Sequence, residues 1–294
     1  MRTRRGSTRR GFPSARRERR VRRRIAAFGG IAAVVLAGFV VARALGINAA
    51  GARVIRFTIH STLLHRAMPV VAVVPAGASN GRRPVVVFLH GKGENQDSNL
   101  DDAMFAALAR LKSGAPDMVF PYGGADSYWH DRADGAWGSY VMREVIGQAV
   151  RRLHADPRRV AIGGISMGGF GALNLARLYP GRFCAVGAHS AALWVHGGDS
   201  APGAFDGAQD FARNDVVAAA RSRAWNRSAP VWVDVGTQDQ FRSADTTLAG
   251  LLRADRLSIR FHLWPGSHDQ AYWQSHWSSY LRFYAAALGR CHHA

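Results

Sequence analysis

The sequence of 294 residues has little cysteine, lysine or acidic side chain, and each shortage limits what the chain can be. Its two cysteines, Cys184 and Cys291, are too few for a scaffold built on disulfides. An oxidising compartment would permit one bridge between them; the alternative is two thiols, one of them buried in a strand. With 48% apolar residues the chain can build a large core, enough for one catalytic domain with an appendage or for two small domains.

Positive charge comes almost entirely from arginine, since Lys92 and Lys112 are the lysines of the chain. We interpret this bias as the mark of a GC-rich genome rather than of an arginine-specific binding surface. The net charge is +19, but residues 1–24 contain twelve arginines and one acid, for +11. The excess therefore describes a tail more than a domain. An apolar run follows that tail directly, so a nucleic-acid partner is not expected.

The uncharged run extends from Ile25 to Ala42. Eighteen residues is near the lower limit for crossing a bilayer, and twelve arginines on one flank predict that this flank stays in the cytoplasm. We therefore expect a cytoplasmic tail over 1–24, a single transmembrane signal-anchor over 25–47, and an extracytoplasmic catalytic domain over 48–294. The alternative is a signal peptide cleaved near residues 49–51, which would release a secreted enzyme.

Runs of strand length alternate with helix-like segments through the domain. VIRFTI and PVVAVVP predict an antiparallel pair, whereas PVVVFLH (84–90) is a continuous apolar run, typical of a strand buried on both faces. LDDAMFAALARL predicts an amphipathic helix, with Ser98 or Asn99 as its cap. The alternation predicts an α/β fold with a mostly parallel sheet and helices on both faces. A long excursion over 191–229 is expected to form a cap or lid.

The stretch AIGGISMGGFGAL (161–173) surrounds Ser166 with glycines where a strand is predicted to become a helix. Gly164 and Gly168 complete the pattern G-x-S-x-G of a nucleophile elbow. The turn is too tight for side chains at these glycines, and it exposes the serine hydroxyl above the sheet edge. The helix that follows stabilises negative charge at its N-terminus. A glycine-rich turn with an incidental serine is the alternative, but the strand–turn–helix context favours a nucleophile.

A serine hydroxyl needs a base, and the base needs a carboxylate that orients it. Asp239 lies in the loop after the strand VWVDVG, and His268 lies between the last strand and the last helix. Asp234 is inside its strand, and helix capping is the expected role of Asp245. We therefore expect Ser166, Asp239 and His268 to form a catalytic triad. The other histidines weighed for the base precede the acid or lie within a strand or helix: His189, His262 and His276.

Attack on an ester creates an oxyanion, which backbone N–H groups must stabilise. We expect one donor from Met167, directly after the nucleophile, and one from Lys92 in LHGKG after the third strand. His90 in the same segment is expected to be structural. The segment SYWHDRADGAW adds three aromatic residues that could line an acyl or alcohol pocket; aromatic cover over the sheet edge is the alternative. They are Tyr128, Trp129 and Trp137.

Six segments between residues 84 and 289 together resemble one branch of the α/β-hydrolases. They are FLHGKGENQD, PYGGADSYWHD, GGISMGGFGAL, FCAVGAHSAALW, VDVGTQD and PGSHDQAYW. That branch contains esterase D, an S-formylglutathione hydrolase, and the mycobacterial antigen 85 mycolyltransferases. The resemblance implies an α/β-hydrolase fold and a serine carboxylesterase or acyltransferase that uses no metal or cofactor. Gly168, Gly169 and Asp269 depart from the antigen 85 pattern, and the expected anchor argues against a cytosolic esterase D.

The sequence thus predicts a membrane-anchored serine carboxylesterase that cleaves acyl esters, of lipids or of the cell envelope, through an acyl-enzyme. An acyltransferase that uses the same acyl-enzyme is one alternative. A catalytically silent hydrolase fold that serves as a binding module is another.

Overall fold

The computed structural model describes residues 48–77, 81–223, 225 and 229–291. The expected tail over 1–24 and the expected membrane segment over 25–47 lie outside these residues. Within the described part of the chain, no helix combines the length and apolar character needed to cross a bilayer.

Eight strands form the central sheet, in the order β1-β2-β4-β3-β7-β8-β9-β10. In chain order these strands are β1 (Arg53–Ser61), β2 (Arg66–Val74), β3 (Val85–Leu89), β4 (Asp117–Pro121), β7 (Val160–Ile165), β8 (Val186–His189), β9 (Val231–Gly236) and β10 (Ile259–Trp264). The pairs β1–β2 and β2–β4 are antiparallel, and every pair from β4 to β10 is parallel. The predicted opening antiparallel pair and the mostly parallel sheet are therefore confirmed.

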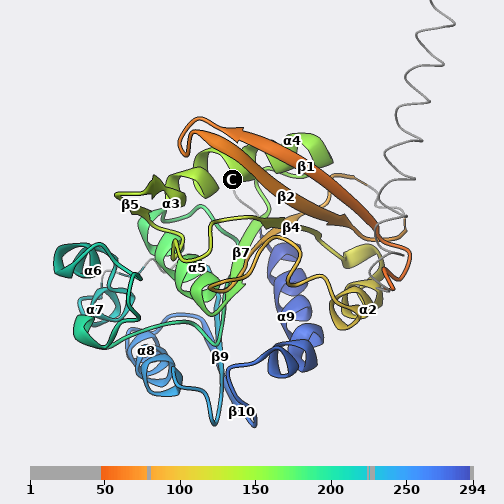
Figure 1. Ribbon diagram of the computed structural model, residues 1–294. Coiled ribbons are helices and arrows are strands. Elements are labelled where there is room, and N and C mark those ends of the chain that lie inside the picture. Colours follow the sequence, from red (N-terminus) through yellow and green to blue (C-terminus); the bar gives the residue numbers. More distant parts are fainter. Residues whose placement is uncertain (1–47, 78–80, 224, 226–228, 292–294) are drawn as a thin grey trace, which may run out of the picture.

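Helices cover both faces of the sheet, which explains why the parallel strands are mostly apolar (Figure 1). Alternate residues of β3 belong to two separate cores, Val87 to one and Phe88 to the other. One face is covered by α2 (Asp102–Arg110) and α9 (Gln270–Gly289). The other face is covered by α4 (Ile146–Leu153), α5 (Met167–Leu178), α7 (Val216–Arg221) and α8 (Arg242–Ala254).

Two helices begin in distinctive ways, α2 with a capping carboxylate and α4 with a π-helical turn before it. The helix α2 begins after Asp101, whose carboxylate accepts the Met104 N–H at 2.7 Å, so the predicted caps Ser98 and Asn99 are wrong. Aspartate in extended backbone before the first turn is a strong cap, and the prediction placed the helix start two or three residues too early. The chain enters α4 through α3 (Trp137–Tyr140) and a π-helical turn over Val141–Val145.

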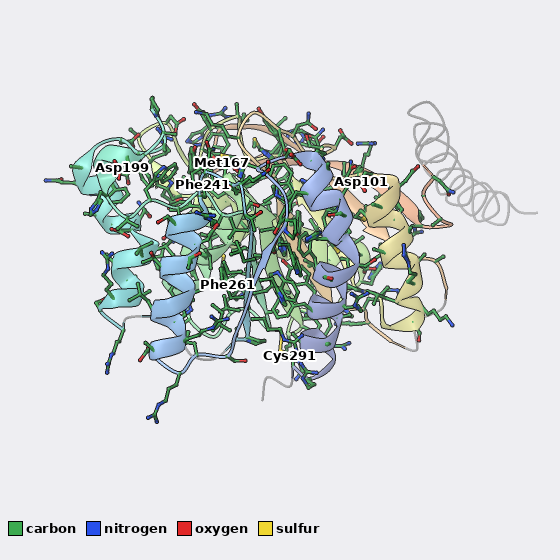
Figure 2. All side chains as sticks on the ribbon, turned by 90° about the horizontal axis from the view of Figure 1, so that it is seen from below. Asp101, Met167, Asp199, Phe241, Phe261 and Cys291 are labelled. Atoms are coloured by element: carbon green, nitrogen blue, oxygen red, sulfur yellow. A yellow bond between two sulfur atoms is a disulfide. The ribbon has the colours of Figure 1, made fainter. Side chains whose placement is uncertain are left out.

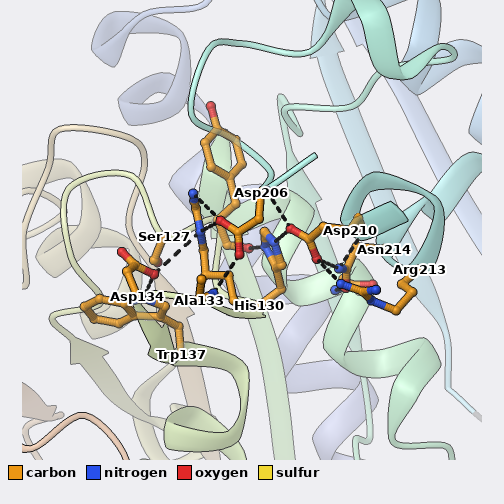
Figure 3. A network of polar contacts seen from close by, with 12 residues as sticks. Ser127, His130, Ala133, Asp134, Trp137, Asp206, Asp210, Arg213 and Asn214 are labelled. Carbon is orange, nitrogen blue, oxygen red and sulfur yellow. Dashed lines mark hydrogen bonds and ion pairs between the residues drawn. The ribbon is translucent and has the colours of Figure 1, made fainter. Parts of the chain in front are cut away.

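The excursion over 191–229 contains α6 (Ala208–Asn214) and α7, and α7 packs against α5 and α8. A polar network fixes it to the loop that carries the short hairpin β5 (Asp131–Arg132) and β6 (Gly135–Ala136) (Figure 3). In this network the His130 ring lies 3.0 Å from the Asp210 carboxylate, and both side chains are buried. The Ala133 N–H donates to Asp206 at 2.6 Å. The excursion is therefore anchored to the body of the domain.

A disulfide joins Cys184, just before β8, to Cys291, just after α9. The sequence left open a bridge or two thiols, and the structure contains the bridge. It lies at one end of the sheet, whereas Met167 and Phe241 lie together at the opposite end (Figure 2).

Candidate active site

Ser166 lies at the carboxyl end of β7, between the strand and α5, with a backbone φ of 55°. This left-handed conformation is strained for a residue with a side chain and is typical of a nucleophile elbow. A Cβ atom on Gly168 would overlap the Leu89 carbonyl oxygen, and one on Gly164 would overlap the Gly168 backbone. Glycine is therefore required on both sides of the serine, as the sequence predicts.

The imidazole of His268 connects Ser166 to Asp239. Its Nε2 atom lies 2.8 Å from Ser166 Oγ, and its Nδ1 atom lies 2.9 Å from Asp239 Oδ2. With Nδ1–H donating to the carboxylate, the Nε2 lone pair faces the serine hydroxyl and can accept its proton. The three residues that the sequence nominated come from the ends of β7, β9 and β10, and the fold brings them into one hydrogen-bonded chain.

The environment of Asp239 keeps its carboxylate ionised. Burial alone would raise its pKa, but hydrogen bonds from His268 and from the Phe241 N–H lower the pKa below its ordinary value. The Phe241 N–H donates to the second carboxylate oxygen at 2.8 Å. An ionised, buried acid can hold the imidazole in one tautomer and stabilise the imidazolium that forms after proton transfer.

The other acids near the site have different partners. Asp234 is inside β9, as expected, and lies 2.6 Å from the His189 ring. Asp245 does not cap α8: that helix begins after Phe241, and the Asp245 side chain is fully buried in the first turn. The capping prediction for Asp245 is therefore wrong, because the chain enters the helix four residues earlier. Asp269 accepts the Tyr272 N–H at 2.9 Å and caps α9.

The loop after β3 lies against the nucleophile. A Cβ atom on Gly91 would be 3.5 Å from Ser166 Cβ, so the backbone of this loop borders the serine. Lys92 follows with an exposed side chain, and Met167 is the first residue of α5, where N–H groups have no carbonyl partner within the helix. The N–H groups of Met167 and Lys92 remain the predicted oxyanion donors.

His90 and Trp129 hold this loop in place. The His90 Nε2 atom accepts the Gly123 N–H at 3.1 Å, and its Nδ1 atom lies 2.8 Å from the Gly91 carbonyl oxygen. Burial lowers the pKa of His90 to about 4, so the ring is uncharged at neutral pH. The Trp129 indole N–H donates to the His90 carbonyl oxygen at 3.1 Å. His90 is thus a structural residue, as expected.

The three aromatic candidates for substrate binding are all buried. Trp129 has no exposed surface, and Trp137 is 3% exposed with its indole N–H donating to Asp134. For these two residues the structure favours the alternative, aromatic cover over the sheet edge. Tyr128 is also buried and contacts Trp194, which packs on Phe241. Tyr128 is therefore connected to His268 through the rings of Trp194 and Phe241.

Sequence reasoning missed Glu94. Its carboxylate accepts the Gly91 N–H at 2.8 Å, directly beside the nucleophile. Burial raises the pKa of Glu94, while the hydrogen bond from Gly91 and the nearby His268 oppose that rise. The one signal in the sequence is an acid in the segment HGKGE that carries the predicted oxyanion donor. Phe241 was missed as well; its ring packs edge-on against His268 at 5.1 Å between centroids.

Comparisons with known proteins identify the family of this chain. Residues 61–284 match the family described as "Putative esterase". Among curated proteins, "Esterase Rv1288" of Mycobacterium tuberculosis is 30% identical over 115 residues, which are 36% of this chain and 25% of that protein. The chain thus matches about a quarter of the length of this relative.

Solved structures show the same fold at low identity. A ferulic acid esterase has a TM-score of 0.70 at 22% identity, covering 80% of this chain and 99% of that one. An S-formylglutathione hydrolase from Agrobacterium tumefaciens has a TM-score of 0.69 at 20% identity, covering 81% and 96%. The family match spans most of the described domain and includes the whole Ser166–His268–Asp239 chain. The protein therefore belongs to the putative esterase family and has the fold and family signature of a serine ester hydrolase.

Proposed function

We propose that the protein is a serine carboxylesterase in which Ser166 attacks the carbonyl carbon of an acyl ester. His268 takes the hydroxyl proton and later gives it to the leaving alcohol, while Asp239 orients the imidazole and stabilises its charged form. The N–H groups of Met167 and Lys92 stabilise the oxyanion. Water, activated by His268, then cleaves the acyl-enzyme and releases a carboxylic acid.

The observation that carries this proposal is the position of the His268 ring, 2.8 Å from Ser166 Oγ and 2.9 Å from Asp239. Both distances are within hydrogen-bond reach, which general-base activation of a serine requires. A silent binding module would have no need of this arrangement, nor of the strained backbone at Ser166. The family match supports the same reaction class.

Active-site labelling tests the proposal directly. We expect the full chain to react with a fluorophosphonate and to hydrolyse p-nitrophenyl esters. Ser166→Ala should abolish labelling and lower ester hydrolysis by about 10⁴-fold or more, because the nucleophile is lost. Circular dichroism should show an unchanged fold in the variant. Labelling that persists in Ser166→Ala would reject this residue as the nucleophile.

The fate of the acyl group separates hydrolysis from transfer. An acyl-enzyme can react with water or with an alcohol, so an acyltransferase would use the same three residues. A series of acyl chain lengths, assayed with and without an added sugar or lipid alcohol, measures both the chain preference and the share of transfer. We expect hydrolysis to dominate, and transfer that outpaces it would favour the acyltransferase.

We also propose that the catalytic domain is extracytoplasmic and anchored by residues 25–47. Support comes from the arginine-rich flank, which predicts a cytoplasmic N-terminus, and from the Cys184–Cys291 bridge, since structural disulfides persist in oxidising compartments. N-terminal sequencing of protein extracted from membranes tests the anchor. A mature chain that starts near residue 50 would instead indicate a cleaved signal peptide and a secreted enzyme.

A further inference from the structure

A cavity lies at the end of the sheet opposite Ser166. Its volume is about 460 Å³, which is within the range of small-molecule sites. Its walls come from α4 and from the segments that precede β3, β7 and β8. Because parallel strands begin at this end and Ser166 follows the carboxyl end of β7, the cavity is separate from the candidate active site.

Three arginines from three different segments line this cavity: Arg82, Arg151 and Arg182. No acidic residue is among the lining residues. Over the described part of the chain, none of the three guanidinium groups makes a hydrogen bond or an ion pair. The carboxylate of the neighbouring Asp156 forms an ion pair with Arg159 at 2.8 Å. The cavity therefore gathers positive charge that no described side chain neutralises.

The electrostatics of Arg182 point the same way. This arginine is half-buried, and burial lowers its pKa, with no carboxylate among the described residues opposing the effect. A guanidinium held partly out of water gains from an anion placed beside it. Its planar fork of N–H donors fits the paired oxygens of a carboxylate or a phosphate.

Apart from the imidazole of His154, the rest of the wall is apolar. Ile146 and Val150 on α4, together with Ala155 and Pro157 after it, face the same space. Gly147, also on the wall, has no side chain, and the Arg151 guanidinium lies 3.3 Å from where its Cβ would be. A bare inorganic anion would use the arginines and leave this apolar wall in contact with water. An anion with a hydrocarbon chain would use both.

We propose that this cavity is a non-catalytic binding site for an amphiphilic anion, a carboxylate or phosphate monoester that carries a short hydrocarbon chain. The charged head would lie between the three guanidinium groups, and the chain would lie along Val150 and Pro157. Such a ligand has the chemistry of a fatty acid or of a lipid phosphate.

Calorimetric titration of the full chain tests the proposal, with octanoate and octyl phosphate as probes. We expect both to bind, the ratio of their affinities showing which head group the site prefers. Octanol, which lacks the charge, and inorganic phosphate, which lacks the chain, should each bind at least about tenfold more weakly. Octanol that binds as tightly as octanoate would overturn the proposal.

Charge-matched variants assign the binding to this cavity. Arg151→Gln/Arg182→Gln should weaken octanoate binding by about tenfold or more. Arg260→Gln/Arg282→Gln removes the same charge beside the edge strand β10 and should leave binding unchanged. Equal affinities in the two double variants would reject the site. If the first variant melts at a lower temperature, the single change Arg82→Gln repeats the test without altering α4. Because the readout is binding, the result does not depend on esterase activity.

Discussion

The His189 ring lies 2.6 Å from the Asp234 carboxylate, so a histidine–aspartate pair other than the pair of His268 and Asp239 lies next to the nucleophile strand. The His189–Asp234 pair is fully buried between the sheet and α9, and Tyr284 from that helix lies 3.0 Å from the other ring nitrogen of His189. Its link to the nucleophile is through the backbone, where the Ser166 N–H donates to the His189 carbonyl oxygen. One pair faces the serine hydroxyl and the other supports the strand beside it.

Asp234→Asn should destabilise the fold. The Asp234 carboxylate accepts from the His189 ring and from three further donors: Trp232, Tyr272 and Tyr280. An amide at this position replaces one acceptor with a donor and leaves buried donors without partners, at a cost of about 2–4 kcal/mol. Urea denaturation measures the free energy of unfolding. We expect labelling of Ser166 in the folded fraction to stay close to wild type, and an unchanged unfolding midpoint would contradict this account.

Asp239→Asn should have the opposite profile. The change removes the charge that balances the imidazolium and disturbs the tautomer, which lowers kcat by about 10⁴-fold in comparable triads. The loss of unfolding free energy should be smaller than in Asp234→Asn. Steady-state kinetics and urea denaturation of both variants test the assignment. Near-wild-type activity in Asp239→Asn combined with an inactive Asp245→Asn would mean that the acid has been misplaced.

Glu94 should act on the rate rather than on substrate affinity. It fixes the Gly91 N–H, so Glu94→Ala frees the loop that carries the Lys92 N–H, and we expect kcat to fall about tenfold with little change in KM. Glu94→Gln keeps an oxygen acceptor and should recover most of that loss. Burial raises the pKa of Glu94, so its negative charge beside His268 is present only above that raised value. The remaining deficit of Glu94→Gln should therefore appear at neutral pH and vanish in acid.

A control variant in the same loop is Gln96→Ala, since its side chain contacts Asp97 and does not hold Gly91. It should match wild type in kcat and in pH profile. If Glu94→Gln is as slow as Glu94→Ala at every pH, Glu94 does not act by accepting the Gly91 N–H.

The fold and Ser166 were predictable because they depend on local patterns. The other two triad residues were predictable from their order along the chain. The surroundings of β3 and of Ser166 can be inferred from their residue types, because burial on both faces and a tight turn restrict which residues fit. Asp239 and His268 follow from chain order at the ends of two strands. The structure places both within hydrogen-bond reach, as that order requires.

The residues that the sequence misplaced depend on contacts between distant segments. Trp129 seemed available to a substrate, but its indole packs over Gly171 and donates to His90, far away in the chain. Glu94 acts through a backbone N–H, which no side-chain pattern reveals. The error at Asp245 has a local cause instead, because the start of a helix is commonly misplaced by about two to four residues when it is located from the sequence.

Breaking the disulfide should weaken the domain without stopping its chemistry. Cys184 and Cys291 are separated by 107 residues, so the bridge restricts the unfolded chain strongly, by about 5 kcal/mol in the loop-entropy account. We expect Cys184→Ser/Cys291→Ser to unfold at lower urea concentration and to keep its kcat, because the bridge lies at the end of the sheet opposite Ser166. Wild type in reducing buffer should behave like the variant. Two alkylated cysteines in the non-reduced native protein would show that no bridge forms.

The anchoring of the excursion over 191–229 is testable through Asp210. Burial would raise its pKa, but hydrogen bonds from the Asp206 N–H and the His130 ring lower it below the ordinary value of 3.8. A lowered pKa in the anchored state means that the ionised form favours anchoring. The stabilisation of the anchored state by the ionised carboxylate is complete above the ordinary pKa of Asp210. It is lost as the pH falls through the lowered pKa. Asp210→Asn lacks it at every pH, so its excursion should be cut by protease at neutral pH at least about tenfold faster than wild type.

Asp199→Asn changes an exposed acid in the same excursion and should be cut at the wild-type rate. Mass spectrometry of the fragments locates the cuts. If Asp210→Asn resists protease as well as Asp199→Asn does, the network with His130 does not hold the excursion in place.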